Sequence, residues 1–323
     1  MENIDKTRKP LPENTGRKAW RYRELVEKGA ASYIAPVTSP WDRSVAPSQL
    51  LEFIDCQAAY LRRREGDRYE APTHVVSRAI GAVVHQEMAK PREQRTKNVA
   101  ALFTGANAVP KQQQVGAVRT AKAIIAVAAR AERKEAPSVN RTVKEPNPIF
   151  WWDKKTQTTW VVKPDEISMT PWFVGVDDTK TGKHRHRYAE IVPFMMGLVV
   201  RETKAWKAIW GVDFEGTVKT RLKYMRGADG RWLPRPEYSL DAIGDKLTRQ
   251  QEARLQGITG FIREMDDAWN RGWFRVQPGD HCQHCNYRND CPLGKKWMLD
   301  HPDPAATALQ APDQPREVAA KSA

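Results

Sequence analysis

The chain has 323 residues, with 53 Lys+Arg against 39 Asp+Glu, a formal net charge of +14 and 40% hydrophobic residues. That hydrophobic share is enough for a sizeable core and excludes a chain that is disordered throughout. No apolar run reaches the length of a membrane helix and no signal segment begins the chain, so we expect a soluble, cytoplasmic protein. The positive charge favours a polyanionic partner, nucleic acid first, over a merely solubilising surface.

Composition predicts three parts along the chain. Residues 1–40 are basic and polar, and we expect them to form an N-terminal arm. Residues 41–298 are expected to form one domain, because neither a repeat nor a linker composition interrupts them. The Pro-, Ala- and Gln-rich residues 299–323 are expected to be a disordered tail.

Helical periodicity dominates the chain before residue 140. Apolar residues recur at helical spacing in 47–66, 74–89 and 115–134, and Ser48 is a suitable N-cap for the first of these helices. We therefore expect three helices ahead of the first long strands.

The period changes at Phe150, where short runs of aromatic and β-branched residues begin. Residues 150–167 are typical of a hairpin that turns at Asp153–Gln157. The remaining elements are expected in the order strand, helix, strand, helix, at 171–178, 188–206, 208–225 and 248–272. This order predicts an α/β (α+β) fold, a small mixed sheet flanked by helices.

Two carboxylates and a lysine follow the hairpin turn at neighbouring strand ends. Asp165 and Asp178 can meet at one edge of the sheet, and their oxygens are ligands that Mg2+ or Mn2+ prefers. Lys180 shares a face of its strand with Asp178, because residues i and i+2 point the same way. It could then position or help to deprotonate an attacking water.

This D-x-K pattern is short, and a solvated charge pair is the alternative interpretation of any single copy. A second candidate set combines Asp177 with Glu202 and Lys204. It is less favoured, because residues 188–206 fit a helix and would place Glu202 on a helix face.

Taken in order, these residues resemble the motif of the PD-(D/E)XK nuclease superfamily. Pro164-Asp165 and Asp178–Lys180 are similar to the motif, and "VDDTKTG" is similar to the RecB-like branch. That branch has a metal-binding histidine on a helix ahead of the sheet, preceded by a glycine, and "GAVVH" supplies Gly81 and His85. Without the resemblance, His85 would be interpreted as a core histidine.

The resemblance implies a restriction-endonuclease-like core and a role for each matched residue. The implied ligands of Mg2+ or Mn2+ are His85, Asp165, Asp178 and the backbone carbonyl of Thr179, with Lys180 orienting the nucleophile. The family helix after the lysine carries Gln-x-x-x-Tyr, whereas this chain has Glu190 and Phe194 in its place.

Three of the four cysteines stand close together in "HCQHCNYRNDCP". Cys282, Cys285 and Cys291 have a C-x2-C-x5-C spacing, and a structural metal site needs a fourth ligand. Four thiolates suit either Zn2+ or a 4Fe-4S cluster, and the spacing leaves both open. Iron-sulfur members of the RecB-like branch carry one cysteine before the core and three after it. This similarity implies a 4Fe-4S cluster held by Cys56, Cys282, Cys285 and Cys291. Such a cluster would link the N-terminal helix that carries Cys56 to the C-terminal segment.

The resemblance implies a metal-dependent DNA exonuclease acting on single-stranded ends by phosphodiester hydrolysis. It places the chain near CRISPR-associated, phage-encoded and AddB-type enzymes, working in recombination, repair, phage DNA metabolism or spacer processing in a bacterial or phage-infected cell. The basic residues 183–187 are expected to face phosphate. A helicase, recombination or integrase protein could be a partner, because the chain has no phosphate-binding loop for motor activity. The alternative is a non-catalytic DNA-binding adaptor with a zinc-bound cysteine site.

Overall fold

The computed structural model describes residues 21–25, 30–34, 41–64, 72–135, 141–180, 188–226, 232–288 and 291–302. Residues 1–20 of the expected arm, 303–323 of the expected tail and the basic residues 183–187 lie outside this part of the chain. The chain divides into two units. The sheet unit comprises Val37–Ile54 and Glu70–Gly272, and the cysteine unit comprises Met1–Pro36, Asp55–Tyr69 and Trp273–Ala323. The domain boundaries expected from composition stay predictions.

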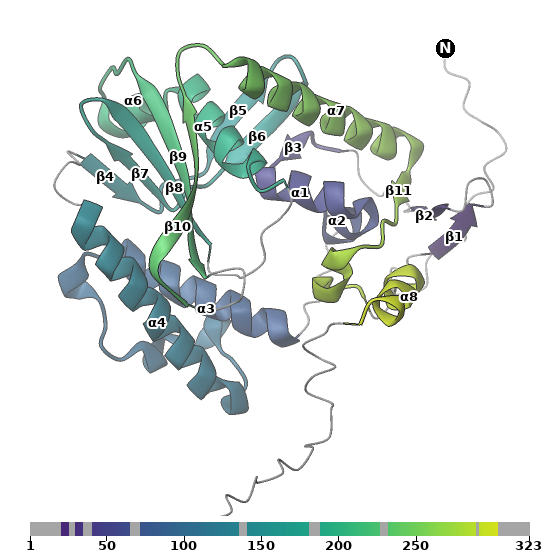
Figure 1. The fold of residues 1–323 in the computed structure, drawn as a ribbon, viewed down its shortest axis with the longest axis horizontal. Helices are drawn as coiled ribbons and strands as arrows, with labels where there is room; N and C mark the ends of the chain where they lie inside the picture. The colour runs from purple at the N-terminus through teal and green to yellow at the C-terminus, as the bar shows by residue number, and fades with distance from the viewer. Residues whose placement is uncertain are drawn as a thin grey trace, which may run out of the picture. The chain divides into compact units, whose positions relative to one another are not determined.

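A five-stranded mixed sheet forms the centre of the sheet unit (Figure 1). Its order is β10 (Trp232–Ile243), β9 (Thr217–Arg226), β8 (Phe173–Lys180), β7 (Glu166–Met169) and β4 (Arg141–Lys144). β8 and β9 run parallel, and the other neighbours run antiparallel. The parallel pair needs a crossover connection, which α5 (Ile191–Thr203) and α6 (Ala205–Trp210) supply.

A second sheet of three short strands contains the predicted hairpin. Its order is β3 (Ser44–Val45), β6 (Thr158–Val162) and β5 (Ile149–Asp153), with β5 and β6 antiparallel. The turn between β5 and β6 is fixed by Asp153, whose carboxylate accepts hydrogen bonds from the Lys155 amide (2.9 Å) and the Thr156 hydroxyl (2.7 Å). The predicted hairpin is therefore confirmed, and its turn residues are those expected.

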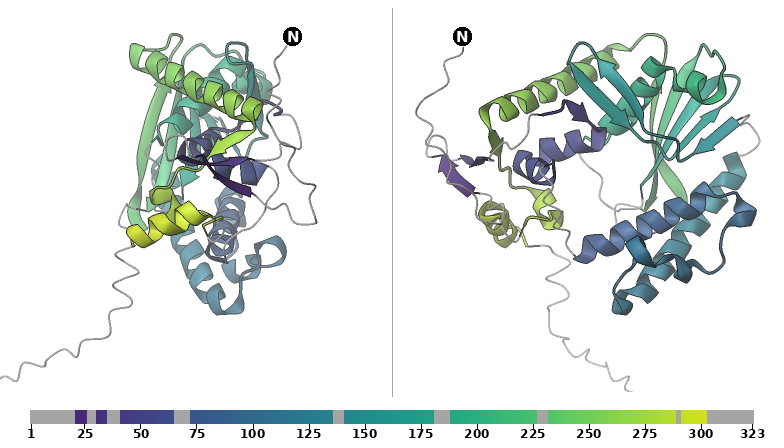
Figure 2. Two further views of the ribbon diagram at one scale, coloured as in Figure 1. Left: turned by 90° about the vertical axis from the view of Figure 1, so that its right-hand side faces the viewer. Right: turned by 180° about the vertical axis from the view of Figure 1, so that it is seen from behind.

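Helices flank the sheets, as the order of elements predicts. α3 (Pro72–Ala89) and α4 (Lys111–Glu135) lie side by side, and the view from behind in Figure 2 shows the pair. Their shared core contains Val83, Val84 and Ile124, each at most 1% exposed. Three short 3-10 helices connect them, η1 (Arg92–Gln94), η2 (Val99–Leu102) and η3 (Gly105–Asn107). The predicted mixed α/β fold with flanking helices is confirmed.

The crossover helix α5 is buried all round, which suits a helix between two sheets. Ten consecutive residues, Ile191–Val200, are buried, and α5 packs against β5, β9 and β10. The predicted helix over 188–206 breaks at Lys204, which adopts a left-handed backbone conformation (φ 47°). The predicted strand over 208–225 is wrong at its start, because α6 occupies the first residues and β9 begins only at Thr217.

The remaining long helix of the sheet unit is α7 (Arg249–Arg271). Thr248 caps it in a capping box with Gln251, and Gly272 ends it with a left-handed conformation (φ 62°). This matches the predicted helix over 248–272. Among the described residues, no helix combines the length and the hydropathy needed to cross a bilayer.

The described residues of the cysteine unit form a small antiparallel sheet and three short helical elements. The sheet has the order β1 (Arg21–Leu25), β2 (Ala30–Ile34), β11 (Trp273–Arg275). The helical elements are α2 (Gln57–Arg64), η5 (Asp280–His284) and α8 (Pro292–Asp300). The predicted helix over 47–66 is divided, because α1 (Pro47–Asp55) ends before Cys56 and α2 begins after it.

Candidate active site

Asp165 stands where the chain passes from the second sheet into the central one, just before β7. Its backbone amide donates to the Asp177 carbonyl (2.9 Å), and its Oδ2 accepts the backbone amide of Thr179 (2.6 Å). Both contacts follow from the antiparallel register of β7 on β8, in which Glu166 lies opposite Asp177. Asp165 is thus held against β8 at both its main chain and its side chain.

Asp178 and Lys180 lie at the end of β8 and form an ion pair through Asp178 Oδ2 and Lys180 Nζ. Asp178 is 8% exposed, and this burial raises its pKa, with the nearby Asp165 adding to the rise while Lys180 opposes it. Burial alone would lower the pKa of Lys180, but attraction to Asp178 and Asp165 outweighs it and raises this pKa. The two predicted residues therefore act electrostatically as one unit with Asp165.

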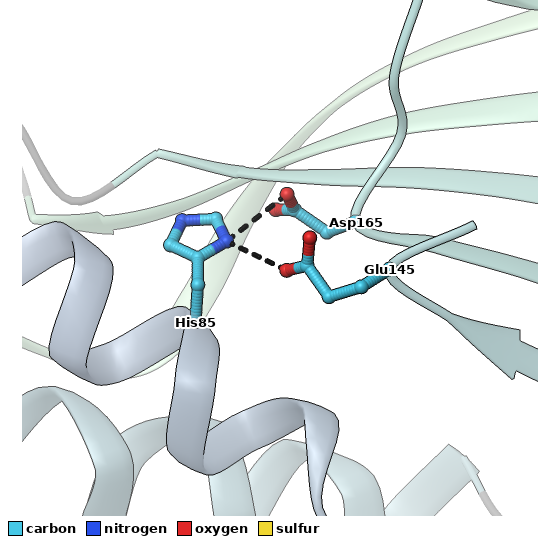
Figure 3. Close-up of side chains that lie close together, drawn as sticks. All are labelled: His85, Glu145 and Asp165. Carbon is cyan, nitrogen blue, oxygen red and sulfur yellow. Dashed lines mark hydrogen bonds and ion pairs between the residues drawn. The ribbon is translucent and has the colours of Figure 1, made fainter. Parts of the chain in front are cut away.

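His85 reaches the same place from α3 (Figure 3). Its Nδ1 lies 3.1 Å from Asp165 Oδ1 and 3.2 Å from Glu145 Oε1. The hydrogen bond with Asp165 raises the pKa of His85 to about 9, against the effect of its burial. The buried neighbours Val83 and Val84 fix α3 in the core and leave His85 facing the carboxylates.

Glu145 is a member of this group that the sequence did not reveal. It follows β4 directly, has a left-handed backbone conformation (φ 47°), and donates its amide to the Asp165 carbonyl (2.7 Å). Its Oε2 lies 3.5 Å from Nζ of Lys163. The only signal that could have found it is the pairing of β4 with β7, because "VKEPN" matches no catalytic motif.

The side-chain ligand atoms of His85, Glu145 and Asp165 lie within 4.8 Å of one another. One imidazole nitrogen and two carboxylates, with Asp178 close by, form a donor set that suits Mg2+ or Mn2+. The three residues and Thr179 line a cavity of about 60 Å3, together with Lys144 and Lys223. The residues present therefore fit a divalent cation.

The alternative set around Asp177 has a different character. Asp177 is 1% exposed and binds Arg221 Nε (2.7 Å) and Lys223 Nζ (2.6 Å) on β9. Glu202 lies on α5, as expected, and pairs with the adjacent Arg201. Asp177 is thus neutralised by cations of the neighbouring strand, which is typical of a structural carboxylate.

The four predicted cluster cysteines all belong to the cysteine unit. Cys56 is packed with Ala58 and Val276, and burial raises its pKa to about 11. Burial also raises the pKa of Cys282, with Cys56 and Cys291 contributing to the rise. A side chain added at Gly294 would lie 3.4 Å from Cys291 Sγ and 3.7 Å from Cys282 Sγ, so these sulfurs converge beside a glycine.

Backbone amides point at two of these sulfurs. The amide of Tyr287 donates to Cys285 Sγ (3.4 Å), and that of Gly294 donates to Cys291 Sγ (3.3 Å). Cys291 is the N-cap of α8, and Pro292 occupies the first turn of that helix. Amide donors of this kind stabilise thiolates that hold a metal or cluster.

A comparison with protein families assigns the chain. The model of the PD-(D/E)XK nuclease superfamily matches residues 44–292. The chain belongs to the PD-(D/E)XK nuclease superfamily. Members of this superfamily are nucleases that use divalent metal ions, so the resemblance seen in the motif is confirmed at this level.

Two solved structures match this PD-(D/E)XK chain at low sequence identity. A "Putative exonuclease" from Eubacterium rectale is 14% identical, with a TM-score of 0.46 over 75% of this chain and 88% of that chain. SSO0001 is 8% identical, with a TM-score of 0.33 over 79% of this chain and 89% of that chain. No protein of curated function matches the sequence.

Proposed function

We propose that the protein is a metal-dependent deoxyribonuclease that acts as an exonuclease on DNA with single-stranded ends. The observation that carries this proposal is the meeting of His85, Glu145 and Asp165 beside the Asp178–Lys180 pair. Membership of a nuclease superfamily and the net charge of +14 support DNA as the substrate. Preference for an end rests on the resemblance to RecB-like exonucleases.

The residues of the candidate active site divide the work of phosphodiester hydrolysis. His85, Asp165, Asp178 and the carbonyl of Thr179 would hold Mg2+ or Mn2+, and we add Glu145 to this set. The bound ion supplies an activated water and neutralises charge that builds on the scissile phosphate. Lys180 presents its ammonium beside these ligands and orients the nucleophile, while the Thr179 amide keeps Asp165 in place.

We propose that the four cysteines hold a 4Fe-4S cluster. The support for this proposal is the resemblance to iron-sulfur members of the RecB-like branch, which have one cysteine before the core and three after it. Four thiolates also suit Zn2+, so the metal content of the purified protein decides between the two.

The proposed activity is tested with single-stranded oligonucleotides labelled at either end. The anaerobically purified protein is mixed with Mg2+, Mn2+ or EDTA, and products are resolved with time. We expect metal-dependent release of short products from one labelled end, with loss of activity in EDTA. Cleavage that begins inside a circular single strand would refute an exonuclease, and an inert protein that still binds DNA would favour the adaptor alternative.

An absorption spectrum tests the cluster on the same preparation. We expect a brown protein with a broad band near 400 nm and iron in excess of zinc. A colourless protein with one zinc per chain, after anaerobic purification from iron-supplied cells, would show a zinc site instead.

A further inference from the structure

Two large aromatic side chains are exposed on the hairpin that leads to Asp165. Phe150 is 61% exposed and Trp152 is 50% exposed, and both stand on β5 two residues apart. Leaving apolar surface exposed to water, rather than burying it, costs about 25 cal/mol per Å2. Aromatic side chains exposed together on one strand indicate a surface that receives a partner.

The hairpin presents these side chains on one face because its other face is buried. Trp151 on β5 lies opposite Trp160 on β6, which is 1% exposed, and β5 packs on α5 with this inner face. Alternation then directs Phe150 and Trp152 outward. Their cross-strand partners on the outer face are Val161 and Thr159. We call Phe150, Trp152, Thr159 and Val161 the aromatic face.

The exposed charges of the hairpin itself are positive. None of its four residues is charged, and Asp153, the only acidic residue in 149–163, is 8% exposed and bonded within the turn. Lys154 and Lys155 are exposed at the turn end of the hairpin. Lys163, 57% exposed, follows β6 at the other end. The face therefore lies between cations at both ends, which suits a polyanion.

The aromatic face ends at the candidate active site. Lys163 Nζ lies 3.5 Å from Oε2 of Glu145, and Asp165 follows two residues later. Asp165 is four positions after Val161, so at most about 14 Å of extended chain lies between them. Phe150 lies directly opposite Val161, about 5 Å away. Both aromatic rings are thus within a few nucleotides of the catalytic carboxylates.

We propose that the aromatic face binds the unpaired bases of a DNA strand and guides that strand to the cavity beside His85 and Asp165. Bases stack on exposed aromatic rings whatever their sequence, whereas paired bases are already stacked in a duplex and cannot do so. Lys154 and Lys155, exposed at the turn, contact the backbone phosphates. A second copy of this chain is disfavoured, because pairing this face with itself would bring its lysines together. The proposal deepens the proposed nuclease function, because it names single-stranded DNA as the ligand of this face.

The test measures binding and cleavage separately with the full chain. Binding of a fluorescent 20-nucleotide polythymidine strand is followed by anisotropy in EDTA, where no hydrolysis occurs. We expect Phe150→Ala/Trp152→Ala to weaken binding at least about tenfold, since one stacked base contributes a factor of about 5 to 150. Trp172→Ala is the matched control, because Trp172 is 73% exposed and lies outside the hairpin. Binding to a blunt duplex should change less than twofold in both variants.

Cleavage in Mn2+ distinguishes failure of this inference from failure of the nuclease proposal. For Phe150→Ala/Trp152→Ala we expect kcat/KM on the 20-mer to fall about tenfold, while hydrolysis of a dinucleotide too short to reach the face is unchanged. A wild-type protein that cleaves nothing would refute the nuclease proposal, and the binding result would still decide this one. If the wild type cleaves DNA and the double variant binds the 20-mer with unchanged affinity, the proposed role of the aromatic face is refuted while the nuclease proposal stands.

A second variant keeps the test decisive if the double substitution impairs folding. Lys154→Gln/Lys155→Gln changes only exposed side chains of the turn. We expect the slope of log K against log salt for the 20-mer to decrease by about 1.4, because each phosphate contact on a single strand contributes about 0.7. An unchanged slope would overturn the proposal. Analytical ultracentrifugation gives a further test. If the wild type sediments as a dimer and Trp152→Ala as a monomer, the aromatic face is a protein interface and the proposal is overturned.

Discussion

Two adjacent carboxylates of β8 should respond in opposite ways to the same substitution. Asp177 is 1% exposed and bound by Arg221 and Lys223, whereas Asp178 belongs to the candidate active site. Asp177→Asn should destabilise the fold and leave the activity of the folded molecules largely intact. Asp178→Asn should abolish cleavage and leave stability nearly unchanged.

The magnitude for Asp177 follows from its contacts. The carboxylate accepts Arg221 Nε at 2.7 Å and Lys223 Nζ at 2.6 Å, and removing one partner of a buried ion pair costs about 3–5 kcal/mol. The side chains of Arg221 and Lys223 are 28% and 13% exposed, so water can partly solvate them after the change. We therefore expect Asp177→Asn to lower the free energy of unfolding by about 3 kcal/mol, the lower end of this range. For a unit of this size, that corresponds to a Tm lower by roughly 6–12 °C.

For Asp178 the expected change in stability is small. Its burial already disfavours the charged form, and its partner Lys180 is 40% exposed and can be solvated by water. Asp178→Asn should therefore shift the free energy of unfolding by less than about 1 kcal/mol.

Thermal unfolding by circular dichroism in EDTA and cleavage of a single-stranded 20-mer at 20 °C measure the two effects. Asp213→Asn is a surface control, because Asp213 is exposed and pairs with Lys207 at the surface. A Tm of Asp177→Asn within 2 °C of the control would refute the assignment of Asp177 as structural. Cleavage by Asp178→Asn at more than a tenth of the wild-type rate would refute its assignment to the active site.

Four further outcomes are expected. Asp165→Ala or Lys180→Ala should lower the cleavage rate at least about 100-fold while DNA affinity in EDTA changes less than threefold; near-wild-type rates would contradict the site. Glu145→Gln should weaken Mn2+ binding about 10- to 100-fold, read from the electron paramagnetic resonance signal of the free ion, and an unchanged affinity would remove it from the ligand set. Mn2+ affinity of the wild type should rise about tenfold from pH 7 to pH 8, because the pKa of His85 is about 9 and a metal needs the neutral imidazole; a flat profile would argue against His85 as a ligand. Cys56→Ser should give a colourless protein of lower Tm, and a brown variant with the Tm of the wild type would disprove the four-cysteine site.

Most of the residues that meet at the candidate active site could be predicted from the sequence, because the spacing of Asp165, Asp178 and Lys180 along two adjacent strands is fixed by local geometry. The prediction of Asp165, Asp178 and Lys180 needs only the β7–β8 hairpin. The prediction of His85 rests on the resemblance of its helix to the family helix. Glu145 could not be predicted, because it depends on β4 pairing with β7 across a gap in sequence that no pattern indicates.

The missed elements have physical reasons of their own. β10 contains Pro234 and Pro236, which argue against a strand, but it is an edge strand of its sheet, where prolines are tolerated, and its pairing with β9 is irregular at this point. The helix over 47–66 was predicted as continuous because its apolar spacing continues through Cys56. Hydrophobic periodicity predicts which face of a helix is apolar. It does not predict where a helix ends and the next begins, as happens here at Cys56.

The cap of α8 gives the proposed cluster a consequence for the lifetime of the protein. Cys291 ends the cysteine run and also begins a helix, since its sulfur accepts the Gly294 amide. If oxidation destroys the cluster, Cys291 changes from a ligated thiolate to a protonated thiol, which is a weaker acceptor, and the first turn of α8 is held less firmly. A helix that frays exposes backbone that proteases can cleave. Oxidised molecules would then be degraded before intact ones, so the cell would retain mainly molecules with a complete cluster.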